Sequence, residues 1–143
     1  MSCSALNETI RVLIVEDNLV DLYFIQEALN SEYTIAARTV DDGGPALTML
    51  QQRSPYENEP QPDLVILDLN LKQVDGREVL SYIRATPTLQ ETAVAIVSSS
   101  PADFAHADSL GADCYIQKPS GMEAFLGIGK RIWECYREKK SRR

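Results

Sequence analysis

The chain alternates short apolar runs with stretches of helix-like pattern, and this alternation constrains the fold more than any other feature. Residues 12–15 and 64–67 are apolar throughout, as expected of strands buried on both faces. Turn and helix-start signals such as Asp75-Gly76 separate the runs. Repeated strand–helix units predict one α/β doubly wound domain, in which a parallel sheet carries helices on both faces. The predicted strands are 10–15, 34–40, 64–67, 93–97 and 114–117, and the predicted helices start near residues 18, 45, 76, 101 and 122, the last two running to about residues 110 and 140.

Length and composition are those of one ordinary globular domain. The chain has 143 residues, of which 44% are apolar and 24% charged, enough to bury a core. Its apolar runs are too short to cross a bilayer, and residues 1–7 lack the features of a signal peptide. Cys3, Cys114 and Cys135 form no CxxC or His/Cys cluster, which favours reduced thiols with a structural role. We therefore expect a cytoplasmic protein that does not enter a membrane.

The net charge of −7 is unevenly distributed. Residues 130–143 carry a net +5 and the remaining residues carry −12. The acidic body argues against direct binding to nucleic acid, which requires an array of cations facing the phosphates. The basic end favours a solvated last helix whose C-terminus attracts cations, and contact with nucleic acid, an acidic partner or a membrane surface is the less favoured alternative.

Polar side chains follow four of the predicted strands. Glu16 and Asp17 follow the first strand, Asp68 the third, Ser98 the fourth and Lys118 the fifth. Because the carboxyl ends of parallel strands share one edge, a strand order of 2-1-3-4-5 would bring these side chains together. Each residue alone has an ordinary explanation, such as helix capping, a turn or a solvated charge. Their coincidence at the ends of different strands favours a site.

The charges of this predicted site call for a divalent cation. One pair of carboxylates about 4 Å apart costs on the order of 4 kcal/mol at an effective dielectric constant of about 20. Lys118 offsets one negative charge, and Mg²⁺, which prefers oxygen ligands, would offset the other two. The same layout suits phosphoryl transfer, with Asp68 as the nucleophile that becomes an aspartyl-phosphate. The metal, Lys118 and the Ser98 hydroxyl would then bind the phosphoryl oxygens.

Several motifs at these positions resemble those of the response-regulator receiver family. They are Val15-Glu16-Asp17-Asn18, Leu67-Asp68-Leu69-Asn70-Leu71, Asp75-Gly76, Val97-Ser98-Ser99 and Tyr115-Ile116-Gln117-Lys118-Pro119. The resemblance implies a flavodoxin-like (βα)5 fold with strand order 2-1-3-4-5. It also implies an N-terminal tail over residues 1–8, a receiver domain over 9–138 and a basic tail over 139–143.

The resemblance further implies a role for each motif residue. Asp68 would accept phosphate from a sensor histidine kinase or a phosphotransfer protein, and Lys118 would stabilise the phosphoryl group. Asp68, Lys118 and Ser98 would carry the catalysis, and Ser98 and Tyr115 would form the switch. The Lys118–Pro119 peptide bond would be cis. The expected Mg²⁺ ligands are Glu16, which acts mostly through water, Asp17, Asp68 and the main-chain carbonyl of Asn70.

One departure from the family pattern concerns the loop after the acceptor. Lys72 stands where family members usually have proline, which predicts a freer loop and a second cation near the site. Asn70 and Ser100 flank the presumed path of attacking water, so these positions bear on the rate of phosphate loss.

A narrower resemblance is to the stand-alone regulators paired with bacterial and cyanobacterial phytochromes. It implies a phytochrome kinase as the partner. It also implies a homodimer through the face of helix four, strand five and helix five, with which Trp133 and Tyr136 on the last helix are compatible.

The function expected from these observations is that of a phosphorylated signalling switch rather than an enzyme. No output domain is expected after the last helix, so the response would pass through protein contacts. The main alternative is a receiver-like scaffold that is never phosphorylated. A phosphatase of the haloacid-dehalogenase type would need an acid where Asn70 stands, and a flavin or nucleotide binder would need a glycine-rich loop after the first strand.

Overall fold

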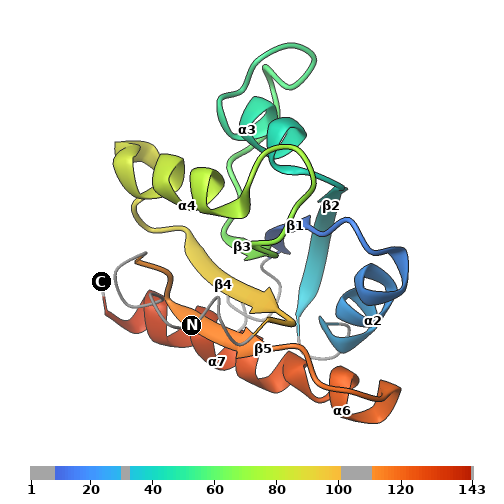
Figure 1. The fold of residues 1–143 in the computed structure, drawn as a ribbon. Coiled ribbons are helices and arrows are strands. Elements are labelled where there is room, and N and C mark those ends of the chain that lie inside the picture. Colours follow the sequence, from blue (N-terminus) through green and yellow to red (C-terminus); the bar gives the residue numbers. More distant parts are fainter. Residues whose placement is uncertain (1–8, 30–32, 101–110, 143) are drawn as a thin grey trace.

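The computed structural model describes residues 9–29, 33–100 and 111–142, and they form a five-stranded parallel sheet (Figure 1). The strand order is β2-β1-β3-β4-β5, which confirms the predicted order. The strands are β1 (Thr9–Val15), β2 (Thr34–Val40), β3 (Leu64–Leu67), β4 (Ala93–Ser98) and β5 (Cys114–Gln117). Every residue of β3 and β4 is buried, because helices cover both faces of these central strands.

The helices divide between the two faces of the sheet (Figure 1). Side chains of α2 (Leu19–Leu29), α6 (Met122–Leu126) and α7 (Ile128–Ser141) bury one apolar cluster against the sheet. Side chains of α3 (Gly43–Leu50), α4 (Gly76–Ala85) and the short 3-10 helix Pro87–Leu89 bury a second cluster on the other face. None of the described helices is long and apolar enough to cross a membrane. The helix predicted to begin at residue 101 lies outside the described residues.

Two details of the helices differ from or refine the prediction. The single helix predicted from residue 122 to about 140 is in fact two helices, α6 and α7, which are separated at Gly127. The Gly127 N–H is shared between the carbonyls of Glu123 and Ala124. Glycine is a weak helix former, which makes a break at this residue inexpensive. At the start of α2, Asn18 is the capping residue, since its Oδ1 accepts from the Asp21 N–H at 3.0 Å.

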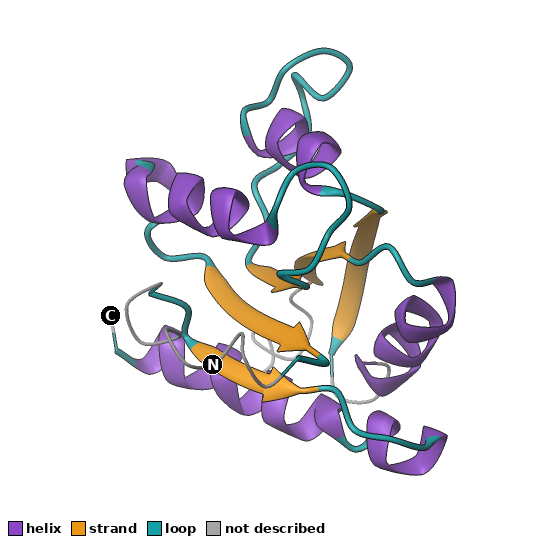
Figure 2. Ribbon diagram, viewed as in Figure 1, coloured by secondary structure: helices purple, strands orange, loops and turns teal. Residues whose placement is uncertain are grey.

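The long connection between α3 and β3 loops out beyond α3 before it returns to the sheet (Figure 2), and it contacts the exposed edge strand β2. Glu59 in this connection forms a bidentate ion pair with Arg38 of β2, with N–O distances of 2.7 and 2.8 Å. The Gln61 side chain donates to the Leu50 carbonyl at 3.1 Å. These contacts tie the connection to the sheet edge and to the end of α3.

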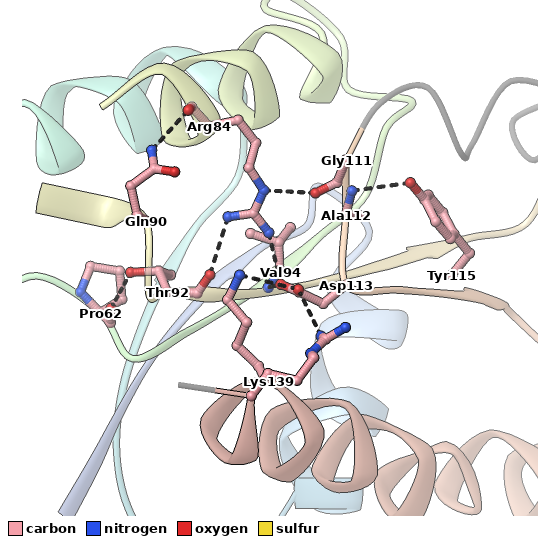
Figure 3. A network of polar contacts seen from close by, with 11 residues as sticks. Pro62, Arg84, Gln90, Thr92, Val94, Gly111, Ala112, Asp113, Tyr115 and Lys139 are labelled. Atoms are coloured by element: carbon pink, nitrogen blue, oxygen red, sulfur yellow. Dashed lines mark hydrogen bonds and ion pairs between the residues drawn. The ribbon is translucent and has the colours of Figure 1, made fainter. Parts of the chain in front are cut away.

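The sequence suggested that the basic end of α7 is solvated. In the structure, part of it forms ion pairs. Lys139 Nζ and Arg142 Nη2 lie 3.3 and 3.4 Å from Asp113 Oδ1, just before β5. Arg84 from α4 holds the other oxygen of Asp113 at 2.7 Å (Figure 3). This network joins α4, β5 and α7 at the edge opposite the carboxyl ends of the strands. The sequence did not predict these ion pairs, because Asp113 lies far from the basic end in sequence, although Arg142 remains largely exposed.

Candidate functional site

Backbone hydrogen bonds hold the predicted site residues rigidly at the carboxyl edge of the sheet. The strand ladder continues past the last strand residues, through Glu16 N to Val40 O at 3.0 Å and Asp68 N to Val15 O at 3.1 Å. Lys118 N likewise donates to Ser98 O at 2.8 Å. The side chains that follow β1, β3 and β5 are therefore positioned by the sheet itself rather than by mobile loops.

Three carboxylates meet at this edge. One oxygen from each of Glu16, Asp17 and Asp68 lies within 4.8 Å of the other two. Glu16 and Asp68 are only 2% and 6% exposed, while Asp17 is half-buried. Burial removes the water that would screen the repulsion between these charges, so the cluster requires cations nearby.

Lys118 supplies one such cation from the end of β5. Its ammonium nitrogen lies 2.8 Å from Glu16 Oε1, 2.8 Å from Asp21 Oδ2 and 3.1 Å from Asp68 Oδ2. The sequence did not single out Asp21, although its place in the first turn of the helix after Asp17 was an available signal. Three carboxylates thus contact this lysine and Asp17 lies close to two of them, which leaves an excess of negative charge at the edge.

Burial and charge shift the pKa values of two of these groups. Burial, with a contribution from the Asp68 charge, raises the pKa of Glu16 to about 7, and the ion pair with Lys118 only partly opposes this. Burial alone would lower the pKa of Lys118, but the ion pairs with Asp21 and Glu16 outweigh it and raise that pKa. Lys118 therefore remains a cation at any physiological pH.

The Glu16 shift predicts a pH-dependent cost to stability in metal-free protein. A raised pKa means that this group's stabilisation is complete below about pH 4.5 and is lost as the pH rises through about 7. The shift corresponds to about 3 kcal/mol. Glu16→Gln, which stays neutral, should therefore gain stability over the unmodified protein by up to about 3 kcal/mol between about pH 5 and pH 8.

Urea unfolding in the presence of a chelator measures this difference. Glu123→Gln, an exposed carboxylate in the first turn of α6, is the matched control and should show no comparable gain. A Glu16→Gln difference that does not change with pH would contradict the assignment.

Ser98 and Asn70 lie beside the Asp68 carboxylate. The Asn70 N–H donates to Asp68 Oδ1 at 3.0 Å, while Lys118 binds Asp68 Oδ2. The Asn70 amide donates to Ser98 Oγ at 3.3 Å, and Ser98 is fully buried. The Ser100 N–H is 3.5 Å from the same hydroxyl. Both oxygens of Asp68 are thus oriented, and the predicted Ser98 and Asn70 join the site.

Tyr115 lies on β5 with its hydroxyl directed away from this edge. The hydroxyl accepts from the Ala112 N–H at 3.1 Å, at the start of β5 (Figure 3). The ring is half-buried and packs against the apolar cluster beneath α4. In the strand register, Tyr115 pairs with Ile96 and Ser98 pairs with Gln117. The two predicted switch residues therefore occupy neighbouring strands, and the tyrosine side chain points toward the opposite end of its own strand.

Comparison with known proteins identifies the family. The sequence matches the response regulator receiver domain over residues 12–128, which is most of the chain. This chain is a response regulator receiver.

Its relatives include regulators from cyanobacteria. It is 37% identical over 116 residues to response regulator Rcp1 of Synechocystis sp., covering 78% of each chain. The crystal structure of the phosphorylated cyanobacterial phytochrome response regulator RcpA superposes with a TM-score of 0.84 at 40% identity, covering 90% of this chain and 94% of that one. The Mn²⁺-bound form of Rcp1 superposes with a TM-score of 0.80 at 34% identity, covering 86% of this chain and 91% of that one.

The acidic edge of this receiver fits a divalent metal ion. The donor set consists of carboxylate oxygens, which Mg²⁺ and Mn²⁺ prefer. Glu16 Oε1 is buried and makes its ion pair with Lys118 without the orientation of a hydrogen bond, so it can still accept a ligand or a metal-bound water. Mg²⁺ would supply positive charge to neutralise the carboxylates and phosphoryl oxygens.

The loop that contains Lys72 is anchored by Asp42. Asp42 Oδ1 accepts from Val74 N at 2.8 Å and Oδ2 from Gln73 N at 3.0 Å, and Oδ1 also accepts from Gly43 N at 2.7 Å at the start of α3. These hydrogen bonds lower the pKa of Asp42, and the one from Val74 N has the largest effect. The sequence predicted a freer loop and treated Asp42 only as a turn residue, so the cross-loop anchor is a contribution of the tertiary structure.

Removal of this anchor should destabilise the receiver. Asp42→Ala loses the helix cap and both loop bonds, and the expected cost is about 1–2 kcal/mol in the free energy of unfolding. Chemical denaturation at neutral pH measures it. The exposed neighbour Asp41→Ala is the control, with an expected change within about 0.5 kcal/mol. Equal effects of the two substitutions would refute the anchoring role.

One prediction about the backbone of the site was wrong. The cis peptide bond of the described residues is Ser54–Pro55, and Lys118–Pro119 is trans. Trans is the intrinsically preferred isomer for a bond before proline. The Lys118 ammonium reaches all three of its carboxylate partners from this conformation, so the ion pairs do not require the cis form.

Gly76 gives the acceptor backbone the space it needs. A Cβ at this position would overlap the carbonyl oxygen of Asp68 and press on the Cα of Leu69. The Gly76 N–H also donates to the Leu69 carbonyl at 3.2 Å. The start of α4 can approach the acceptor segment this closely because residue 76 has no side chain.

Proposed function

We propose that Asp68 accepts a phosphoryl group from the phosphohistidine of a sensor histidine kinase or phosphotransfer protein, and that the receiver signals through the protein contacts that this modification changes. The observation that carries the proposal is the environment of Asp68. Lys118 lies 3.1 Å from one of its oxygens, the Asn70 N–H 3.0 Å from the other, and Glu16 and Asp17 complete an acidic group around it.

Transfer would be an in-line displacement. An oxygen of Asp68 bonds to phosphorus while the bond from phosphorus to the histidine nitrogen breaks. The cationic Lys118 and the Ser98 hydroxyl bind phosphoryl oxygens as charge moves onto them. Glu16 through water, Asp17, Asp68 and the main-chain carbonyl of Asn70 would hold Mg²⁺. Ser98 and Tyr115 would change position afterwards and pass the signal to the surface.

The surface around Asp68 supports docking of a helical kinase domain. Leu19, Val20 and Tyr23 of α2 and Met122 of α6 are 58–77% exposed, which is unusual for large apolar side chains. A cleft of about 450 Å³ lies between these helices, with Asp21 and Lys118 in its lining. An apolar rim around an acidic centre suits a partner that presents a histidine on an amphipathic helix surface.

The relatives support a narrower partner. Because the chain is similar to RcpA, a phytochrome response regulator, over nearly its whole length, we infer that its kinase is a phytochrome. Residues 9–138 would form the receiver and residues 139–143 its basic end, in which α7 continues to Ser141. The receiver would act in the cytoplasm as a switch without an enzymatic activity on other substrates.

We also propose a homodimer through β5, α7 and the segment 101–110, which lies outside the described residues. Trp133 and Tyr136 do not support this pairing, because they are 1% and 9% exposed and pack within the protomer against Tyr33. Light scattering before and after phosphorylation tests the dimer. A monomer under both conditions would remove this part of the proposal and leave the phosphorylation intact.

Acetyl phosphate provides the direct test of the phosphorylation. Incubation with Mg²⁺ should add one phosphoryl group, detected by intact mass, and a chelator should prevent the addition. A folded protein that gains no mass under these conditions would favour the unphosphorylated scaffold. A panel of purified phytochrome and other histidine kinases, assayed for transfer, then tests the identity of the donor separately.

A further inference from the structure

Two cysteines outside the phosphorylation site are brought together by the packing of α7 on β5. Cys114 is the first residue of β5 and is half-buried, packed against the apolar cluster beneath α7. Cys135 lies on the buried face of α7 and is 4% exposed. The helix packs directly on this strand, and the Cys114 thiol is the first cause of a raised pKa of Cys135, so the two side chains lie near each other. The sequence had assigned both residues a structural role, because no motif connects them.

Polar contacts at this end of the sheet fix the position of α7 over Cys114. Lys139 and Arg142 of α7 reach Asp113, the residue before Cys114, at 3.3 and 3.4 Å. Asp113 is itself held by Arg84 at 2.7 Å and by the Val94 N–H at 2.8 Å (Figure 3). Residues four apart share a helix face, so Cys135 lies one turn before Lys139 on the side that faces the start of β5. The approach of the two thiols is therefore built into the tertiary structure.

We propose that Cys114 and Cys135 are a redox-active pair that forms a reversible intramolecular disulfide when a hydroperoxide oxidises the protein. The thiolate of Cys114 attacks the peroxide oxygen, which gives a sulfenic acid and releases an alcohol, or water from hydrogen peroxide. The sulfur of Cys135 then attacks the Cys114 sulfur, and the sulfenic hydroxyl leaves as water with the thiol proton. Two thiols and one hydroperoxide become one disulfide, one alcohol and one water. A small-molecule dithiol reverses the change.

The different environments of the two thiols set the order of these steps. Cys114 is the more exposed of the pair, so an oxidant in solution meets it first. The Cys114 thiol and burial raise the pKa of Cys135, which keeps its proton. Cys135 is thus the resolving thiol, close enough to react once Cys114 is oxidised.

A disulfide here would lock the final helix to the strand that leads into the site. The residue after Cys114 is Tyr115, and the same strand ends just before Lys118. The expected physical effect is a higher unfolding temperature for the oxidised form, by about 10 °C from loop closure. The inference does not rest on the phosphorylation of Asp68, because the pair lies at the opposite end of β5.

Thiol counting by mass spectrometry tests the proposal in the full-length chain. A Cys3→Ser background removes the third cysteine. After treatment with hydrogen peroxide and denaturation in N-ethylmaleimide, the protein should have lost two hydrogen atoms and should take up no maleimide until it is reduced. Cys114→Ser and Cys135→Ser in the same background are matched controls, and each should form no intramolecular disulfide.

Three other outcomes would overturn the proposal. The first is that both thiols remain alkylatable after oxidant treatment of the folded protein. The second is over-oxidation of Cys114 to a sulfinic acid while Cys135 stays alkylatable. The third is a covalent dimer on a non-reducing gel, which would place the reactive thiols on the surface between copies. Circular dichroism before treatment confirms that each variant is folded.

Discussion

Asp68→Asn should abolish phosphorylation by acetyl phosphate or by a kinase, with no mass gain detected under conditions that modify the unsubstituted protein fully. The amide cannot act as the attacking carboxylate, and two other carboxylates at the edge are already engaged in ion pairs with Lys118. Glu16 is 2% exposed and paired with Lys118, and Asp21 binds the same lysine. The fold should persist, because asparagine is nearly isosteric and the substitution removes one of several repelling charges.

A matched control separates this effect from a general loss of acidic charge. Asp41→Asn alters an exposed carboxylate in the turn before α3 and should be phosphorylated like the unsubstituted chain. Binding of Mn²⁺, followed by calorimetry, should weaken in Asp68→Asn and stay unchanged in Asp41→Asn. Full phosphorylation of Asp68→Asn would show that another residue is the acceptor and would refute the assignment of Asp68.

Lys118→Met should produce the largest loss of stability among substitutions at the site. The substitution keeps an apolar stem of similar length but removes the ammonium from its three carboxylate partners, two of which are buried. Removal of one member of a buried ionic group costs on the order of 3–5 kcal/mol, because the remaining charges are left uncompensated. For a chain of this size the expected fall in the unfolding temperature is about 10 °C.

The pH dependence of this loss distinguishes electrostatics from packing. Without the lysine, the pKa of Glu16 should rise further, so the deficit should be small near pH 5 and should grow as the pH rises toward about 8. Mg²⁺ should restore part of the stability, because it binds the folded state and supplies the missing positive charge. Lys130→Met, an exposed lysine on α7, is the control. A loss of stability that changes with neither pH nor Mg²⁺ concentration would indicate a packing defect.

Local sequence pattern was sufficient for the strands and for most of the site. Apolar runs identify β3, β4 and the second half of β1, because residues covered on both faces of the sheet are almost all apolar. The carboxyl ends of parallel strands share an edge, so the residues after these runs had to meet there. Glu16, Asp17, Asp68 and Lys118 do meet, at distances typical of ion pairs or of a metal site.

Features that depend on contacts between distant segments were not accessible in this way. Asp21 joins the site only because α2 packs next to the end of β5. Asp42 anchors the loop after Asp68 from a different strand–helix turn.

The chain pattern alone therefore specified which residues stand at the ends of strands, because periodicity and turn residues are properties of the local backbone. It could not specify which partners those residues or the other polar and sulfur-containing groups would find. The pairing of Cys114 with Cys135, and of Asp113 with Arg84 and the basic end of α7, follows from how helices pack on the sheet. Such packing is set by the burial of apolar surface from the whole domain at once, and no short stretch of sequence contains that information.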